Sequence, residues 1–163
     1  MLESSRLAGI RAVALDVDGV LTDGGFYWGA NGEEFKRFSF ADVMGVSLAR
    51  KAGLAFALIS GEASPLVDRY AAKMGITAVH KGCKDKAAAL SDFAAALQVP
   101  LKQVCFVGDD VNDLPAMRIA GLSAAPCGAH ADVLGFVDIV MTHSGGNGAV
   151  RELLDAIVAA KNT

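Results

Sequence analysis

Acidic residues gather in two short segments, and each segment follows an apolar run. The first, "VALDVDGVLTDGG", holds Asp16, Asp18 and Asp23, and the second, "GDDVND", holds Asp109, Asp110 and Asp113. Carboxylates brought close together would repel one another without a cation. Oxygen-only ligands suit Mg²⁺, which often keeps waters and binds through a few carboxylates plus a phosphate. The two segments therefore predict a magnesium site if the fold brings them together.

The spacing within the first segment also suits phosphoryl transfer to an aspartate. An aspartate can act as a nucleophile and form an aspartyl phosphate. A second carboxylic acid two residues later can protonate the leaving oxygen and then deprotonate the attacking water, which is typically worth about 10²–10⁴-fold in rate. Lys86, Ser60 and backbone N–H groups near a helix start would offer positive charge and hydrogen bonds to a phosphoryl group.

Each of these features has a more ordinary explanation when it stands alone. The D-x-D-G sequence could open a calcium loop, but the EF-hand pattern needs its glycine at the sixth position and Gly19 is the fourth. Ser60 could be a loop or cap residue, Lys86 a solvated helix residue, and "GDDVND" a turn with capping aspartates. The combination is more specific, because each piece falls at a strand–helix junction.

Apolar runs alternate with helical patterns through most of the chain, and these elements must position the polar residues. The apolar runs lack polar alternation, as expected for parallel strands covered on both faces. The predicted strands are 12–17, 54–60, 77–80, 103–108, 121–125 and 137–142, and the predicted helices are about 42–52, 62–74, 84–97, 111–118 and 147–161. This order predicts an α/β fold with a doubly wound, Rossmann-like parallel sheet.

The predicted sheet would bring the candidate residues to one edge. Ligands of open parallel sheets bind beyond the carboxyl ends of the strands. The first strand ends at Asp16 and Asp18, the second at Ser60 and Gly61, and the fourth in "GDDVND", while Lys86 opens the helix after the third. We therefore expect these residues to converge on one crevice.

Segment 24–40 breaks the strand–helix rhythm. Its aromatic arms flank "GANG", which predicts a β-hairpin inserted after the first strand. No 50–100-residue insertion is present that could form a lid, so residues 1–163 are expected to form one domain with a hairpin flap and no cap domain. Phe26, Tyr27 and Trp28 would form an apolar liability unless a partner or their own sheet covers them.

The composition narrows the functional classes. The 163 residues are 53% hydrophobic and carry a net charge of −3, which indicates a globular chain and favours neither nucleic acid nor an anionic membrane surface as a partner. No apolar run reaches the length of a membrane-spanning helix and no signal peptide is recognised, so we expect a cytoplasmic protein. The three cysteines and three histidines lack disulfide or ligand spacing.

These motifs resemble those of the haloacid dehalogenase superfamily of phosphatases, over nearly the whole chain. "DVDGVLTDG" resembles the first motif, which implies Asp16 as nucleophile and Asp18 as general acid/base and, through its backbone carbonyl, metal ligand. "LISG", "KDKAAAL" and "VGDDVNDLPAM" resemble the other three. They imply Ser60 and Lys86 on the phosphoryl group, Asp109 and Asp113 at Mg²⁺, and a capping or supporting role for Asp110; Asp23 has no assigned role.

The chain is also similar to the small capless branch that hydrolyses 3-deoxy-2-keto sugar acid phosphates, typified by the octulosonate 8-phosphate phosphatases. "DGVLTDG", the hairpin and the tail "SGGNGAVREL" (144–153) carry this likeness. It implies a homotetramer in which hairpins associate and neighbouring subunits cover the active sites. It also implies a place in lipopolysaccharide or sialic-acid-type synthesis.

Two departures bear on the substrate. Glu62 and Asn147 stand where the octulosonate 8-phosphate phosphatases usually carry arginine, so two potential bidentate contacts to a carboxylate or phosphate are missing. Glu62 with Lys73 resembles relatives that act on nine-carbon acid 9-phosphates. On one helix these two would share a face about 16 Å apart, so Lys73 would reach a neighbour's site or be a solvated lysine, and Glu62 would contact substrate or stabilise the first turn. The predicted substrate contacts are Gly61, Glu62, Lys73 and Asn112.

Proteins of other classes share parts of this pattern. A signalling receiver domain stores a phospho-aspartate, but on a later strand, and a D-x-D on the first strand favours hydrolysis instead. A non-catalytic assembly module could lose its catalytic aspartates, yet Asp16, Asp18, Lys86 and Asp109 are all present. A phosphomutase usually has a lid that retains its intermediate. A sugar-acid phosphatase is the leading hypothesis.

Overall fold

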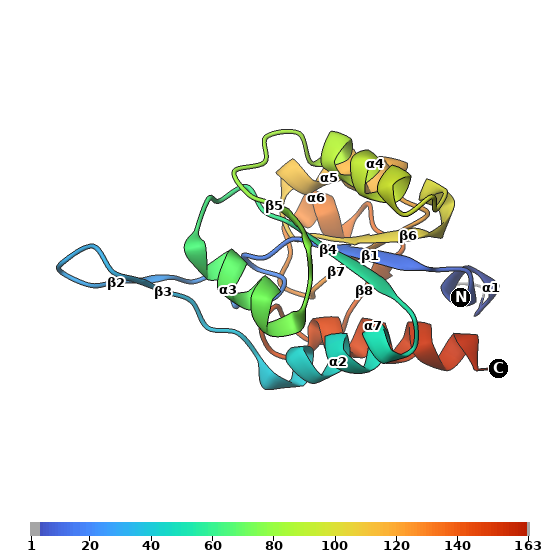
Figure 1. The fold of residues 1–163 in the computed structure, drawn as a ribbon, viewed down its shortest axis with the longest axis horizontal. Helices are drawn as coiled ribbons and strands as arrows, with labels where there is room; N and C mark the ends of the chain where they lie inside the picture. Colours follow the sequence, from blue (N-terminus) through green and yellow to red (C-terminus); the bar gives the residue numbers. More distant parts are fainter. Residues whose placement is uncertain (1–3, 163) are drawn as a thin grey trace.

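The computed structural model describes residues 4–162 and is built around one twisted parallel sheet. Six strands lie side by side in the order β5-β4-β1-β6-β7-β8, and in Figure 1 the sheet runs through the middle of the molecule between two groups of helices. Their bounds are β1 Ala12–Leu15, β4 Ala55–Ile59, β5 Ala78–His80, β6 Val104–Val107, β7 Leu122–Ala125 and β8 Ile139–Val140. This confirms the predicted doubly wound α/β architecture.

Helices cover both faces of the sheet. The helices are α1 Ser4–Ala8, α2 Phe40–Lys51, α3 Pro65–Met74, α4 Lys86–Ala96, α5 Leu114–Ile119, α6 Ala131–Leu134 and α7 Ala149–Lys161, with single 3-10 turns at η1 Leu101–Gln103 and η2 Val111–Asp113. In Figure 1, α4, α5 and α6 lie over one face, and α2, α3 and α7 lie over the other. No helix within residues 4–162 is long and apolar enough to cross a membrane.

Strand β1 shows why the strands read as unbroken apolar runs. Its four residues are fully buried, because the sheet has helices on both sides. Val13 and Leu15 pack into the core beneath α2 and α7, while Ala12 and Ala14 pack beneath α4 and α5. Alternate side chains of a strand point to opposite faces, so both faces select apolar residues.

Some element bounds differ from the predicted ones. The predicted helix 62–74 begins only at Pro65, because the Ser64 side chain caps it by accepting a hydrogen bond from the Leu66 N–H. The predicted helix 111–118 is divided into η2 and α5, with Asp110 and Asp113 forming a capping box at the start. Helices α1 and α6 were not predicted, since runs of five and four residues carry too little periodicity.

The predicted hairpin is present and projects from the body of the molecule. Strands β2 Tyr27–Trp28 and β3 Glu34–Phe35 pair antiparallel, and each is shorter than the predicted arms. Figure 1 shows the hairpin at the end of the molecule opposite both termini, which is also the end at which β1, β4 and β6 finish. The large apolar side chains exposed on it are Phe26, Tyr27, Trp28 and Phe35.

Candidate active site

Three neighbouring strands deliver the candidate residues to one edge of the sheet. β1 lies between β4 and β6, and all three run in parallel. Asp16 follows β1, Ser60 follows β4, and Asp109 stands two residues after β6. The Asp16 N–H donates to the Val107 carbonyl at 2.9 Å, which carries the pairing of β1 with β6 up to the site. The crevice expected from the sequence is therefore present.

The two acidic segments meet in a carboxylate cluster. Oxygens of Asp16, Asp109 and Asp113 all lie within 4.8 Å of one another. Asp16 and Asp113 are buried and Asp109 is half-buried. Three carboxylates held this close with so little solvent repel one another, and hard oxygen ligands of this kind fit a divalent cation such as Mg²⁺. The cluster confirms that the two motifs converge, and these residues could hold a metal.

Lys86 lies beneath the cluster and neutralises part of its charge. It is the first residue of α4, whose Asp85 cap accepts from the Ala88 N–H. Its Nζ donates to Asp16 Oδ1 at 3.0 Å and to Asp113 Oδ1 at 2.7 Å. Burial alone would lower the pKa of Lys86, but the two carboxylates outweigh it and raise that pKa. Lys86 therefore stays an ammonium ion.

The acidic groups show the cost of this crowding. The pKa of Asp16 is raised well above its usual value, first by desolvation and then by the charge of Asp113, against the opposing effect of Lys86. Desolvation and the charge of Asp113 also raise the pKa of Asp109, to about 6. Both shifts arise first from burial and second from the mutual repulsion of the carboxylates.

The loop that follows β6 is held in shape by its own aspartates. Asp113 Oδ2 accepts hydrogen bonds from the N–H groups of Asp109 at 2.9 Å and Asp110 at 3.1 Å. Asp110 Oδ1 accepts from the Val111 N–H at 2.7 Å. Asp110 is thus a cap at the start of η2, which was one of the two roles expected for it. Asp113 orients the loop as well as contacting Lys86.

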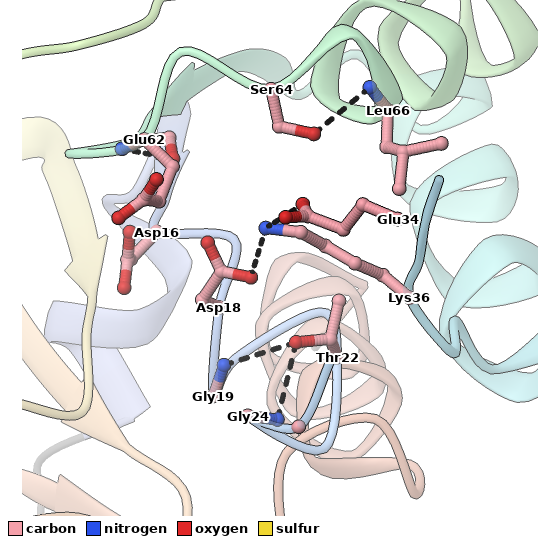
Figure 2. Close-up of polar contacts among 12 residues, drawn as sticks. Asp16, Asp18, Gly19, Thr22, Gly24, Glu34, Lys36, Glu62, Ser64 and Leu66 are labelled. Atoms are coloured by element: carbon pink, nitrogen blue, oxygen red, sulfur yellow. Dashed lines mark hydrogen bonds and ion pairs between the residues drawn. The ribbon is translucent and has the colours of Figure 1, made fainter. Parts of the chain in front are cut away.

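The turn after β1 is equally tight. Gly19 adopts a φ of +86°, and a side-chain carbon there would overlap the Asp109 carboxylate. The Thr22 hydroxyl accepts from the N–H groups of Gly19 and Gly24, both at 3.2 Å, as Figure 2 shows. Asp23, which had no assigned role, accepts from the Gly25 N–H at 3.0 Å and braces the same loop. These bonds fix Asp18 beside the carboxylate cluster.

Most of the predicted site residues line one cavity of about 250 Å³. Its lining comes from all of the strand ends described above. The residues are Asp16, Asp18, Gly24, Gly61, Glu62, Lys86, Asp109, Asp110 and Asn112. The acidic residues, Lys86 and Gly61 thus lie around one cavity, as the predicted convergence requires.

A second cavity of about 210 Å³ adjoins the first and opens under the hairpin. Asp18, Gly24 and Glu62 line both cavities, so they mark the boundary. The rest of its lining is Phe26, Trp28, Glu34 and Lys36. The sequence reasoning missed Glu34 and Lys36. The available signal was their spacing, since residues two apart in a hairpin arm share a face.

Ser60 and Glu62 lie together in the loop between β4 and α3. Ser60 is buried at the end of β4, and its hydroxyl accepts from the Glu62 N–H at 3.2 Å. Glu62 precedes α3, so the expected placement of Glu62 and Lys73 on one helix, with Glu62 in its first turn, is wrong. The cap at Ser64 starts the helix later and leaves Glu62 free to face both cavities.

Lys73 is not brought to these cavities within one chain. It lines a third, mainly apolar cavity of about 390 Å³ between α2, α3 and the hairpin base, which shares only Lys36 with the second cavity. Its Nζ lies 5.9 Å from the centre of the Phe40 ring, within the range of a cation–π contact. A contact between Lys73 and the substrate would therefore have to come from another subunit, and that role stays a prediction.

The tail segment packs behind the site rather than into it. The Gly146 N–H donates to the Val20 carbonyl at 3.1 Å, and the Arg37 guanidinium donates to the Gly146 carbonyl at 2.8 Å and to Asn147 Oδ1 at 3.1 Å. Side chains at Gly145 or Gly146 would overlap the backbone of the turn after β1. The tail thus supports the turn that carries Asp18.

Comparisons with known proteins agree with this arrangement. A family model described as haloacid dehalogenase-like hydrolase matches residues 39–121. The 3-deoxy-D-manno-octulosonate 8-phosphate phosphatase KdsC of Escherichia coli (strain K12) is 41% identical over 152 residues, which cover 93% of this chain and 81% of that protein.

Solved structures show the same likeness. The crystal structure of 3-deoxy-D-manno-octulosonate 8-phosphate phosphatase from Yersinia pestis has a TM-score of 0.95 at 38% identity and covers 98% of this chain and 86% of its own. The enzyme of that name from Moraxella catarrhalis, in complex with a magnesium ion, a phosphate ion and KDO, has a TM-score of 0.94 at 34% identity, with coverages of 98% and 91%.

Three observations point to one family. They are the carboxylate cluster formed by the two acidic segments, the sheet shared with the solved structures, and the 41% identity over 93% of the chain. The chain belongs to the haloacid dehalogenase-like hydrolases, in the family of the 3-deoxy-D-manno-octulosonate 8-phosphate phosphatases, and is a phosphoric monoester hydrolase.

Proposed function

We propose that the protein is a Mg²⁺-dependent phosphatase that hydrolyses 3-deoxy-D-manno-octulosonate (KDO) 8-phosphate to KDO and phosphate through an aspartyl phosphate. The names of its relatives support the substrate, and the Moraxella relative holds magnesium, phosphate and KDO together. The observation that carries the proposal is the pair of adjoining cavities with Asp18 on their shared boundary.

The first cavity suits the phosphoryl group. Asp16, Asp109 and Asp113, with the Asp18 carbonyl, would hold Mg²⁺, which when bound offsets the negative charge that otherwise keeps an anionic substrate from an anionic nucleophile. Lys86 supplies a second positive charge directly beside Asp16. An Asp16 carboxylate oxygen attacks phosphorus here, and Ser60 stands at the end of β4, directly before Gly61 of the cavity lining.

Asp18 faces both the cavity proposed for the phosphoryl group and the cavity proposed for the leaving group. Because it lines the first cavity and the second, it would lie beside the ester oxygen that joins phosphorus to the leaving group. It gives that oxygen a proton as the ester bond breaks, and it later takes a proton from the water that attacks the aspartyl phosphate. Asp16 lines the first cavity alone, which suits the nucleophile.

The second cavity suits a polyhydroxylated leaving group. Glu34 and Glu62 present carboxylates that accept hydrogen bonds from hydroxyl groups. Phe26 and Trp28 stand 4.9 Å apart between ring centres and offer an apolar wall for C–H groups of a sugar. This lining is a better match for a polyhydroxylated leaving group than for an apolar alcohol.

Replacement of the two aspartates tests the chemistry. Asp16→Asn and Asp18→Asn should each nearly abolish hydrolysis of KDO 8-phosphate, while circular dichroism shows the native helix content. EDTA should silence the enzyme, and added Mg²⁺ should restore it. Normal turnover by Asp16→Asn, or turnover that persists without metal, would refute the proposed mechanism.

A nine-carbon acid 9-phosphate, of the 2-keto-3-deoxynononate (KDN) or N-acetylneuraminate type, is the alternative substrate. Glu62 favours it, since it lines both cavities at the position where the octulosonate 8-phosphate phosphatases usually carry arginine. The test is a comparison of kcat/KM for KDO 8-phosphate and the nonulosonate 9-phosphates with the same enzyme preparation. A higher value for a 9-phosphate would transfer the assignment to that substrate class.

We also propose that the active protein is a homotetramer. The exposed Phe26, Tyr27 and Trp28 on the projecting hairpin support this, because such a cluster is costly to leave in water. A neighbour's Lys73 could then complete the site. Size-exclusion chromatography with light scattering should give four times the chain mass, and a stable monomer with full activity would contradict the proposal.

A further inference from the structure

Lys36 reaches from the hairpin into the active site and contacts Asp18. Its side chain is only 2% exposed, although the hairpin projects into solvent. Its Nζ donates a hydrogen bond to Asp18 Oδ1 at 2.6 Å, as Figure 2 shows. Lys36 follows β3 directly, so this contact joins the hairpin to the loop after β1.

The ammonium group of Lys36 is held in place from its other side as well. Removing a charge from water is costly unless it is paired. Glu34 Oε1 lies 3.7 Å from Lys36 Nζ, and Glu34 Oε2 accepts a hydrogen bond from Trp28 Nε1 at 3.1 Å. The lysine is therefore fixed between two carboxylates, one from the hairpin and one from the catalytic loop.

This contact distinguishes the two oxygens of Asp18. Oδ1 is occupied by Lys36, and in Figure 2 the other oxygen, Oδ2, is turned away from Lys36. Among residues 4–162, Lys36 is the one residue that donates a hydrogen bond to the Asp18 carboxylate. The side chain of Asp18 is 29% exposed, so without this bond it could rotate about its side-chain torsions.

We propose that Lys36 is a positioning residue that holds Asp18 with Oδ2 toward the scissile ester oxygen; this rests on the proposed function. In the first step the bond from phosphorus to the ester oxygen breaks, a bond from Asp16 to phosphorus forms, and the Oδ2 proton passes to the ester oxygen. In the second step water gives a proton to Oδ2, its oxygen bonds to phosphorus, and the bond from Asp16 breaks. Lys36 exchanges no atom in either step.

The dependence of rate on the leaving group tests this role. An alkoxide needs a proton as it leaves, whereas 4-nitrophenolate does not. The ratio kcat/KM reports the steps up to the departure of the leaving group. Lys36→Met should therefore lower kcat/KM for KDO 8-phosphate by roughly 10- to 100-fold and for 4-nitrophenyl phosphate by less than about 3-fold, since misplacement of a catalytic group costs up to about 10² in rate. Lys36→Arg, which keeps the cation, should recover much of the loss.

The matched control is Lys102→Met, which removes an exposed lysine of η1, before the amino end of β6. It should leave kcat/KM for both substrates unchanged. Lys36→Gln keeps a polar group beside Glu34 and should show the same selective loss if Lys36→Met does not fold. Equal losses on the two substrates, or none, would overturn the positioning role. Asp18→Asn serves as the reference: if it too lacks selectivity, the acid role of Asp18 in the proposed function fails first.

Discussion

Lys86 is the residue whose removal should most disturb both the fold and the chemistry. Its side chain is 2% exposed, and its Nζ lies 3.0 Å from Asp16 and 2.7 Å from Asp113, whose side chains are 8% and 0% exposed. Lys86→Met fills the same space but leaves two buried carboxylates without their cation. Breaking a buried pair in this way costs about 3–5 kcal/mol. For a chain of this size, that loss should lower Tm by roughly 6–20 °C.

The loss should depend on pH and on metal. Unpaired buried carboxylates have folded-state pKa values above the unfolded value of 3.8, so the variant loses stability as pH rises above that value and regains it as pH falls. Added Mg²⁺ should also narrow the difference from the parent protein, because it supplies positive charge to the same cluster.

Urea denaturation at pH 7, with and without Mg²⁺, measures this free energy of unfolding directly. Lys84→Met is the matched control, since Lys84 is exposed two residues earlier and should tolerate the change. A Lys86→Met protein as stable as Lys84→Met at pH 7 without metal would refute the view that Lys86 compensates the carboxylates.

Two further predictions concern the support of the site. Gly45→Ala should destabilise the protein by about 1–3 kcal/mol in urea denaturation, because the added carbon would lie 2.9 Å from Arg151 Cδ and 3.0 Å from Arg151 Cα where α2 packs on α7. An unchanged urea midpoint would show that α2 and α7 accommodate the added carbon without loss of stability. Glu152→Gln should lower stability at pH 7 but not near pH 2. Burial opposes the ionised form of Glu152, but hydrogen bonds from Thr142 and His143 prevail and lower its pKa from 4.5 to about 2. Its stabilisation is therefore complete above pH 4.5 and is lost as pH falls toward 2. A stability difference that is equal at pH 7 and pH 3 would contradict this assignment.

The sheet was predictable because each of its central strands is buried on both faces. That burial leaves only apolar residues between Ala12 and Leu15, and the chemistry-bearing residues stand directly after the strand. A parallel sheet then brings Asp16, Ser60 and Asp109 to one edge without further information. The carboxylate cluster and the position of Lys86 follow from this topology.

The hairpin contribution was not predictable in the same way. Lys36 and Glu34 belong to an arm of the hairpin, and the contact of Lys36 with Asp18 depends on the angle at which the hairpin leaves the body. The start of α3 was misjudged for a local reason. The pattern of apolar residues favours helix from residue 62, whereas a single serine cap at Ser64 decides where the helix begins.

The Gly145–Gly146 turn behind the loop after β1 has a thermodynamic consequence. It fills the space into which that loop could otherwise move, and the Gly146 N–H bonds to the Val20 carbonyl. The conformational entropy of the catalytic loop is thus lost when the chain folds and not when the substrate arrives. Binding energy from the sugar acid is then available to favour the transition state instead of ordering Asp18.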